Sequence, residues 1–413
     1  HMVQRIAGIL VALSASLCTQ AQDVLGFSLA EGKQKVSIPI QIQNNLVIVP
    51  VVLNGQLPLK FILDTGVRTS ILTEKLYSDI LNLSYSRRYS IAGPGGEKLV
   101  EAYVTNNVSL TLPGVNSRGH ALLVLEKDYL ELRNTLGMDV HGVLGYELFS
   151  RFIVDIDYEQ RILTLMLPER FRARRRFAKL PISIEDTKPY LETIIQVSDT
   201  AHVPVKLMMD SGASHGLLLE QTENGQIRVP EKHVNSIIGR GLGGVITGQI
   251  GRIKSIQLGR YELEGPLVNF PDEYSYRDTL KTSGSVFRNG TIGGEVLSRF
   301  HVIFDFPREV VYLRKNSAYK KEFFYNMSGI TLKAKGSRLR NFEITNVRQG
   351  SPAALADIKT GDELLTINGA KTSELTMDQV IAFLNQKPGK KIHLEVSRQG
   401  ERLKKLITLE NVL

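Results

Sequence analysis

The stretch LPLKFILDTG at residues 57–66 and the stretch VPVKLMMDSG at residues 203–212 share one pattern. Each is an apolar segment that ends in an aspartate, followed by a hydroxyl residue and a glycine. One such triplet has little meaning, because Asp, Ser, Thr and Gly are ordinary turn residues. Two triplets in matching sequence contexts indicate a duplicated unit that carries one carboxylate in each copy, Asp64 and Asp210.

A second pair of matching segments lies downstream of the two triplets. GVLGYELFSRFIVDIDYEQRILTL at residues 142–165 aligns without gaps onto GTIGGEVLSRFHVIFDFPREVVYL at residues 290–313. Internal similarity of this kind indicates repeated structural units. We therefore predict two tandem lobes, residues 40–168 and 182–316, joined by a basic linker at residues 169–181.

Both lobes are predicted to be mainly β. Their segments are short, rich in Val, Ile, Leu and Tyr, and separated by Gly, Pro and Asn, as at residues 46–53 and 100–112. Helical periodicity is scarce. The chain from about residue 324 repeats neither lobe and alternates strand and helix patterns, with Ser351 and Thr376 as candidate helix N-caps. Residues 321–413 are therefore expected to form a separate α+β domain.

The lobes resemble the pepsin and retropepsin class of aspartic proteases. That class has an Asp-Thr/Ser-Gly signature and, later in each lobe, two apolar residues followed by Gly. Here those followers are Val143-Leu144-Gly145 and Thr291-Ile292-Gly293, the second with Thr at its first position. The resemblance covers residues 40 to 316 and implies two acid-protease lobes that face each other.

The resemblance also implies a mechanism. Two carboxylates about 3 Å apart do not both ionise cheaply, so the pair shares one proton and holds one water, and one acid acts as base while the other acts as acid. Asp64 and Asp210 are the catalytic candidates. The resemblance implies supporting roles for the residues that follow them. Thr65 and Ser211 would cross-link the two loops by hydrogen bonds, and Gly66 and Gly212 would let the backbones approach closely.

Glycine-rich hairpin tips occur midway through each lobe. In the family, flaps in this part of the chain close over an extended peptide and exclude water. The candidate flap tips are Gly93, Gly95, Gly96, Gly241, Gly243 and Gly244. Plain hairpin turns are the alternative interpretation, whereas a phosphate-binding loop is not expected because neither cluster opens a helix after a strand.

Several residues depart from the family pattern or fit other chemistries. Val67 and Arg68 stand where a small residue and then Ser, Thr or an acid are usual, so Arg68 is either salt-bridged outward or close enough to lower the pKa of Asp64. Ser214 lies in a G-x-S-x-G pattern, but a serine nucleophile needs a strand–turn–helix elbow. The histidines, among them His202, His215 and His233, show no metal-ligand spacing.

The C-terminal domain resembles bacterial PDZ domains through GSPAALA at residues 350–356, TGDELL at 360–365 and ING at 367–369. In that family a loop offers backbone N–H groups to a peptide's C-terminal carboxylate, and the adjacent strand accepts the peptide as an extra strand. The segment Met327-Ser328-Gly329-Ile330 fits that loop, with residues 376–385 as the helix across the groove. A groove closed by the protease lobes is the alternative.

The N-terminus is typical of a secretory signal peptide, residues 1–22, with a membrane anchor or a buried helix as the alternative interpretation. Arg5 precedes an uncharged apolar run from Ile6 to Cys18 that is too short to span a bilayer permanently. We expect export to the periplasm or medium, with membrane association only through this region. Cys18 is the single cysteine, and lipid anchoring there is not expected because Leu17 replaces the usual small residue; thiol chemistry in the mature chain is excluded.

The formal charge is +9, but much of the excess lies between Arg170 and Lys179 without interleaved aromatic residues, which indicates a solvated linker rather than a nucleic-acid surface. No cofactor or metal is expected, and the expected partners are polypeptide substrates and peptide C-termini. The sequence therefore predicts an exported aspartic endopeptidase with a PDZ domain. The alternative is a non-catalytic peptide-binding scaffold with a degenerate protease fold.

Overall fold

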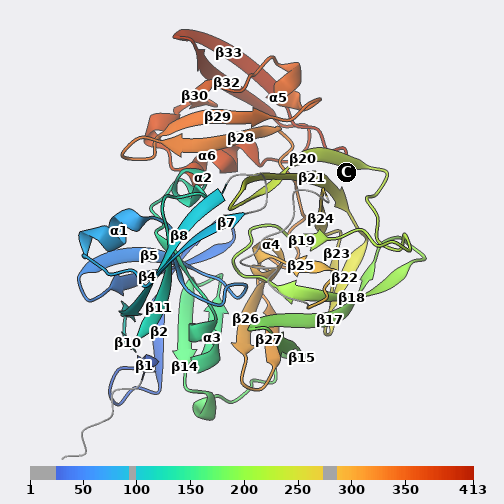
Figure 1. Ribbon diagram of the computed structural model, residues 1–413. Helices are drawn as coiled ribbons and strands as arrows, with labels where there is room; N and C mark the ends of the chain where they lie inside the picture. Colours follow the sequence, from blue (N-terminus) through green and yellow to red (C-terminus); the bar gives the residue numbers. More distant parts are fainter. Residues whose placement is uncertain (1–24, 93–98, 273–285) are drawn as a thin grey trace, which may run out of the picture.

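A computed structural model describes residues 25–92, 99–272 and 286–413 (Figure 1). Two β lobes lie side by side, and a third, smaller unit formed by the C-terminal residues lies across their upper ends. The chain is mainly β, as the sequence predicts. The expected signal peptide lies outside the described residues. Within the described part of the chain, no helix is both long and apolar enough to cross a bilayer.

Lobe 1 is built on a nine-stranded sheet with the order β3-β4-β5-β12-β6-β11-β8-β7, and β9 pairs with β4. Its strands are β3 (Gln41–Gln43), β4 (Leu46–Leu53), β5 (Leu57–Leu63), β6 (Ile71–Leu72), β7 (Arg87–Ala92), β8 (Leu99–Val108), β9 (Leu110–Thr111), β11 (His120–Leu125) and β12 (Gly142–Leu144). Beside it lie β1 (Gly26–Leu29), β10 (Val115–Arg118), α1 (Lys75–Ile80), α2 (Leu132–Leu136) and α3 (Tyr146–Arg151).

Lobe 2 is built on a ten-stranded sheet with the order β20-β21-β24-β19-β25-β18-β17-β22-β23, and β16 pairs with β17. Its elements are β16 (Ser183–Glu185), β17 (Lys188–Gln196), β18 (His202–Met209), β19 (Leu217–Leu219), β20 (His233–Gly241), β21 (Gly244–Arg252), β22 (Ser255–Leu258), β23 (Tyr261–Glu264), β24 (Leu267–Pro271), β25 (Gly290–Ile292) and α4 (Gly294–Leu297). The strands that precede Asp64 and Asp210, β5 and β18, occupy equivalent places in the two sheets.

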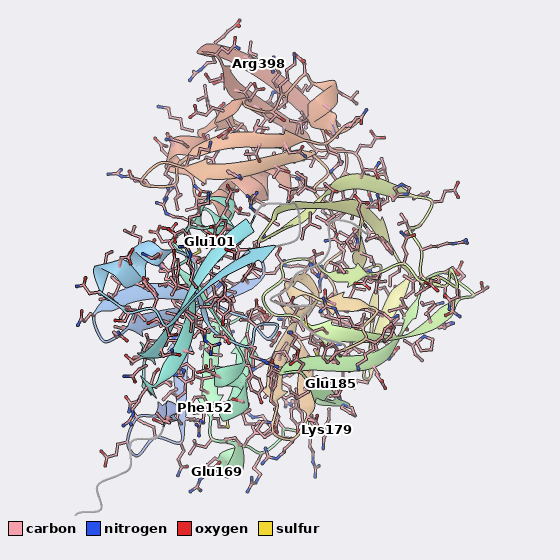
Figure 2. All side chains as sticks on the ribbon, in the orientation of Figure 1. Glu101, Phe152, Glu169, Lys179, Glu185 and Arg398 are labelled. Carbon is pink, nitrogen blue, oxygen red and sulfur yellow. The ribbon has the colours of Figure 1, made fainter. Side chains whose placement is uncertain are left out.

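A six-stranded sheet joins the lobes, in the order β15-β27-β26-β13-β14-β2. Its strands are β2 (Lys35–Pro39), β13 (Ile153–Asp157), β14 (Ile162–Met166), β15 (Ala178–Pro181), β26 (Phe300–Asp305) and β27 (Val310–Lys315). The repeated strands β13 and β26 pair with each other at its centre. Buried aromatic rings at Phe152, Phe300 and Phe304 pack around it, and Phe152 is labelled in Figure 2.

The segment expected to be a linker is partly ordered structure. Residues Pro168–Arg170 form a single 3₁₀ turn, η1, and β15 takes the last residues of the segment into the shared sheet, paired with β27. Ala178 and Leu180 alternate inward along β15, which explains why this end forms a strand. Glu169 and Lys179, labelled in Figure 2, lie at the end of the molecule opposite the C-terminal domain.

The C-terminal domain has its own sheet, β28-β29-β30-β32-β33, with β31 paired to β30. Its elements are β28 (Ile330–Lys335), β29 (Asn341–Val347), α5 (Pro352–Leu355), β30 (Glu363–Ile367), β31 (Ala370–Lys371), η2 (Thr372–Glu374), α6 (Met377–Leu384), β32 (Lys391–Arg398) and β33 (Glu401–Thr408). The predicted caps are confirmed: the Ser351 hydroxyl accepts from the Ala354 N–H, and Thr376 forms a capping box with Gln379.

Candidate active site

Asp64 and Asp210 directly follow β5 and β18, and the two loops are built alike. In lobe 1 the downstream strand β12 runs parallel to β5, and the Asp64 N–H donates to the Leu144 carbonyl at 2.8 Å. In lobe 2 β25 runs parallel to β18, and the Asp210 N–H donates to the Ile292 carbonyl at 2.7 Å. The same backbone arrangement therefore places each aspartate, and both side chains are buried.

The repeated glycines after β12 and β25 allow this arrangement. A Cβ on Gly145 would overlap the carbonyl of Val67, and a Cβ on Gly293 would overlap the carbonyl of His215. Only glycine leaves room for backbone at these two places. This is the physical reason for the apolar-apolar-Gly pattern seen in the sequence.

The two aspartate loops are cross-linked by their hydroxyl residues. The Ser211 N–H donates to the Thr65 hydroxyl at 3.0 Å, and the Thr65 N–H donates to the Ser211 hydroxyl at 3.1 Å. Each hydroxyl in turn donates across the lobes, Thr65 to the Met209 carbonyl and Ser211 to the Leu63 carbonyl. All four hydrogen bonds join residues of different lobes, so they fix the separation of the two aspartates.

The two carboxylates face one small space. The position that a Cβ of Gly66 would take lies 3.1 Å from Asp64 Oδ1 and 3.3 Å from Asp210 Oδ1. A Cβ on Gly212 would overlap the Asp64 carboxylate itself. The Gly66 N–H donates to Asp64 Oδ1 at 2.7 Å, and the Gly212 N–H donates to Asp210 Oδ1 at 3.0 Å. One oxygen of each carboxylate therefore lies close to the same point beside Gly66.

A cavity of about 510 Å³ adjoins Asp210. Lobe 1 contributes the β3–β4 turn and α2 to its lining, and lobe 2 contributes the β20–β21 hairpin. Strands β28 and β29 of the C-terminal domain supply a third wall. Apolar and polar side chains both line it, so the cavity offers apolar contacts together with a small number of hydrogen-bonding and charged groups.

The tip of the lobe 2 hairpin is buried against lobe 1. Gly241 pairs with Gly244, so Leu242 and Gly243 form a two-residue turn between β20 and β21. Leu242 is 3 % exposed and packs in an apolar cluster with Val67, the residue after the lobe 1 triplet. The hairpin therefore bridges the two lobes. The lobe 1 candidates Gly93, Gly95 and Gly96 lie outside the described residues.

Arg68 points away from the aspartates. Its guanidinium forms an ion pair with Asp186, at the β16–β17 turn of lobe 2, and its side chain is 61 % exposed. Of the two interpretations of this departure, the outward salt bridge is the one that the structure contains. The other departure, Thr291, has its hydroxyl 2.8 Å from His215 Nε2 and is buried.

Glu295 is a partly buried acid next to the lobe 2 aspartate loop, and the sequence did not single it out. Its N–H donates to the His215 carbonyl, and burial raises the pKa of Glu295 to about 7, although Arg299 and Arg252 oppose the shift. The sequence does contain this acid at a repeated position, since Glu295 aligns with Glu147. The desolvation that raises its pKa, however, depends on tertiary packing.

The serine-hydrolase alternative does not fit the geometry. The segment around Ser214 leads into strand β19, not into a helix, so the strand–turn–helix elbow is missing. Among the described residues, no group of three or more His, Cys, Asp or Glu side chains is placed to hold a metal ion. His202 and His233 lie at the starts of β18 and β20, apart from the aspartates in the fold.

The predicted carboxylate loop of the C-terminal domain precedes β28. Met327, Ser328 and Ile330 are buried, and Gly329 has a φ of 81°. The Ile330 N–H donates to the Ser328 hydroxyl at 3.2 Å. One of the backbone donors expected to face a peptide carboxylate is therefore already engaged within the loop.

Helix α2 of lobe 1 covers one end of the expected groove. The Asn134 side-chain N–H₂ donates to the Ala334 carbonyl of β28 at 2.8 Å. Gly137, which ends α2, lies so close to α6 that a Cβ there would overlap Met377. Lobe 1 therefore contacts both β28 and α6, the two elements expected to flank a peptide groove.

Two family comparisons match this architecture. Residues 49–148 match the aspartyl protease family, and residues 325–397 match the PDZ domain family. The chain combines an aspartyl protease domain with a PDZ domain. The protease and PDZ resemblances inferred from the sequence are thereby confirmed, the first through a match within lobe 1.

Similarity to individual proteins is partial. The chain is 40 % identical over 55 residues to a Tax1-binding protein 3 homolog of Caenorhabditis elegans, which is 13 % of this chain and 43 % of that protein. It is 39 % identical over 61 residues to a putative zinc metalloprotease of Agrobacterium fabrum, 15 % of this chain and 16 % of that one. The chain thus spans less than half the length of either relative. Soybean basic 7S globulin aligns over 72 % of this chain and 100 % of its own, with 11 % identity and a TM-score of 0.38.

Proposed function

We propose that this protein is an aspartic endopeptidase in which Asp64 and Asp210 activate one water. The observation that carries the proposal is the paired placement of two buried carboxylates around one space, held by hydrogen bonds between the lobes. One carboxylate takes a proton from the water while the water oxygen attacks the scissile carbonyl carbon. The other carboxyl group protonates the carbonyl oxygen. The amide nitrogen is then protonated and the C–N bond breaks, without an acyl-enzyme.

Cleavage of a peptide library tests this proposal. We expect the wild-type chain to cleave, and Asp64→Asn and Asp210→Asn each to lower kcat by about 10²–10⁴-fold, because an amide cannot exchange the proton. Asp199→Asn is the matched control, since Asp199 is exposed on lobe 2 and forms its ion pair with Lys254, away from the two acids. Equal turnover by wild type and Asp210→Asn would favour the alternative, a peptide-binding scaffold without catalysis.

For the PDZ domain we propose that it binds polypeptide C-termini and that this binding competes with α2. The support is the contact of Asn134 with the carbonyl of Ala334, at the edge where an added peptide strand would hydrogen-bond. A peptide long enough to reach Ala334 has to displace this side chain. Binding at the groove would then loosen α2, which also lines the cavity beside Asp210.

Peptide titration tests the competition. Asn134→Ala removes one hydrogen bond, worth roughly 1 kcal/mol, so a six-residue peptide with a free apolar C-terminus should bind about fivefold more tightly to this variant than to wild type. The same peptide with an amidated C-terminus is the control and should bind neither. If Asn134→Ala leaves the affinity for the free peptide unaltered, α2 does not compete.

We further propose export to the periplasm or medium, supported by the apolar run from Ile6 to Cys18. Sequencing the N-terminus of the protein recovered from the periplasm of a bacterial host tests this, with cleavage expected near residue 22. Recovery of uncleaved chain from the cytoplasm alone would refute it.

A further inference from the structure

The C-terminal domain supplies one wall of the cavity beside Asp210. Thr331 and Lys333 of β28 and Thr345 of β29 line the same space as Asp210, facing the hairpin of lobe 2. Three separate units of the chain therefore enclose the place where a substrate would lie. The protease lobes alone do not define its shape.

The strand pattern of β28 explains why these side chains reach the cavity. Ile330, Leu332 and Ala334 are buried in the C-terminal domain, so the alternate residues Thr331 and Lys333 project from the opposite face. The pairing of β28 with β29 shifts register between Thr331 and Leu332. Thr345 is the extra residue at this irregularity, and its hydroxyl donates to the Thr331 carbonyl at 3.3 Å.

Two cations line the cavity where the C-terminal domain meets the lobe 2 hairpin. Arg240, from the hairpin, and Lys333 both line the cavity, and both form ion pairs with Glu131 at the start of α2, the Arg240 pair at 3.2 Å. Glu131 is not among the lining residues. Glu131, behind the cavity surface, is thus an ion-pair partner that Arg240 and Lys333 share, and these two side chains make their part of the lining positive, at a different place from Asp210.

The position of these cations is fixed from several sides. The Arg240 Nε donates to the Tyr129 carbonyl at 3.1 Å, in addition to its pair with Glu131. Glu131 itself has a φ of 50°, a left-handed conformation that costs a non-glycine residue roughly 1–2 kcal/mol. The ion pairs with Arg240 of lobe 2 and Lys333 of β28 hold Glu131 in this conformation. Fixed cations bind a carboxylate better than mobile ones, because less side-chain freedom is lost on binding.

We propose that Arg240 and Lys333 form a carboxylate-binding subsite of the peptidase, so that the enzyme prefers polypeptides with a carboxylate a few residues from the scissile bond. This inference rests on the proposed peptidase function. Elsewhere the cavity lining includes apolar side chains that would contact apolar substrate residues, among them Leu46, Leu136 and Leu218. The carboxylate comes from an Asp or Glu side chain or from the C-terminus of the substrate, and the two sources are separated by the test.

The test uses full-length chain and a peptide with apolar residues around the scissile bond, scanned with Glu or Gln at each flanking position. One series is amidated at the C-terminus, and a second has Gln throughout and a free C-terminus at varied distance. The kcat/KM of each pair is measured, and the affinity of each peptide for the Asp210→Asn chain is measured by fluorescence anisotropy. The affinity measurement tests the carboxylate preference even if no peptide is cleaved.

Lys333→Gln is the diagnostic variant and Lys335→Gln its matched control. Lys335 lies on the same face of β28, pairs with Glu343 and is not a cavity-lining residue. We expect wild type to prefer Glu over Gln, or a free terminus over an amide, about tenfold at one position, a factor that corresponds to about 1.4 kcal/mol. In Lys333→Gln the ratio should fall toward one, while Lys335→Gln should keep it.

Three outcomes would overturn the subsite: no preference by wild type at any position, an unchanged ratio in Lys333→Gln, or an equal fall in both variants, which would indicate a general surface-charge effect. Thermal melts show whether Lys333→Gln is folded. If it is not, Lys333→Arg provides the second variant, and it should retain the preference. Absence of cleavage with a preserved binding preference would instead refute the peptidase function and leave the carboxylate site.

Discussion

The two lobes are alike in the loops that hold Asp64 and Asp210, and they differ in the contacts of the Glu and Arg residues that follow Gly145 and Gly293. In each lobe the repeat places a Glu and an Arg one helical turn apart after the second glycine, Glu147 and Arg151 in lobe 1 and Glu295 and Arg299 in lobe 2. Arg151 donates to the Leu25 carbonyl, near the N-terminal end of the described chain. Arg299 donates to the Ala318 and Glu322 carbonyls, in the segment that leads to the PDZ domain.

The acids at the two positions differ as well. Glu147 is partly exposed and pairs with His120, which is buried. Glu295 is also only partly exposed, but the surrounding protein desolvates its carboxyl and raises its pKa to about 7. The two lobes thus share the close backbone approach around the aspartates, while the equivalent arginines hold different segments, the first described residues in lobe 1 and the connection to the PDZ domain in lobe 2.

The largest expected effect on stability comes from the two glycines that pack against the aspartate loops. Gly145→Ala and Gly293→Ala each place a Cβ against backbone, so each should lower the free energy of unfolding by about 1–3 kcal/mol or more. Gly239→Ala is the control, because a Cβ there meets nothing within 4 Å. Chemical denaturation measures all three. If one glycine tolerates alanine and the other does not, the two loops are not equivalent.

The next largest effect is a pH-dependent change of stability that arises from Glu295 in lobe 2. Because the pKa of Glu295 is about 7 in the folded chain and near its ordinary value of 4.5 when unfolded, the folded state holds its proton more tightly. The penalty of ionising Glu295 is absent below about pH 4.5 and grows as the pH rises to about 7, by about 1.4 kcal/mol for each pH unit between the two pKa values. Glu295→Gln should therefore stabilise the chain at pH 8 by roughly 1–3 kcal/mol and have little effect at pH 4.

Glu147→Gln should act in the opposite direction at pH 8, because it weakens a pair with a buried histidine and removes no buried charge of the Glu295 kind. Thermal melts of wild type and both variants between pH 4 and pH 8 measure the contrast. A stabilisation by Glu295→Gln that does not vary with pH would mean that its ionisation is not the cause.

The smallest effect concerns the contact between the lobes at Arg68. Its pair with Asp186 is largely exposed, and exposed pairs contribute about 0–1 kcal/mol. Arg68→Gln should thus change stability by less than about 1 kcal/mol and leave the pH optimum of peptide cleavage in place. A displaced optimum would show instead that the guanidinium acts on Asp64.

Much of the fold could be read from local patterns. The strand at residues 46–53 is found as predicted, and the helix at 376–385 is found at Met377–Leu384. The strand predicted at 100–112 is interrupted after Val108 and continues as the short β9, close to Asn107 with its φ of 57°. A single left-handed residue within an apolar stretch leaves little trace in the pattern of hydrophobicity.

Local patterns were sufficient to predict the duplication, the two aspartate triplets, the glycines beside them and the PDZ domain, because each depends on neighbouring residues or on a repeat visible in one chain. Long-range packing, in contrast, buries Leu242 against lobe 1, brings α2 to β28 of the PDZ domain and places Lys333 at the cavity of Asp210. These contacts join residues more than a hundred positions apart. Their geometry follows from how whole sheets pack, which no local pattern of residues encodes.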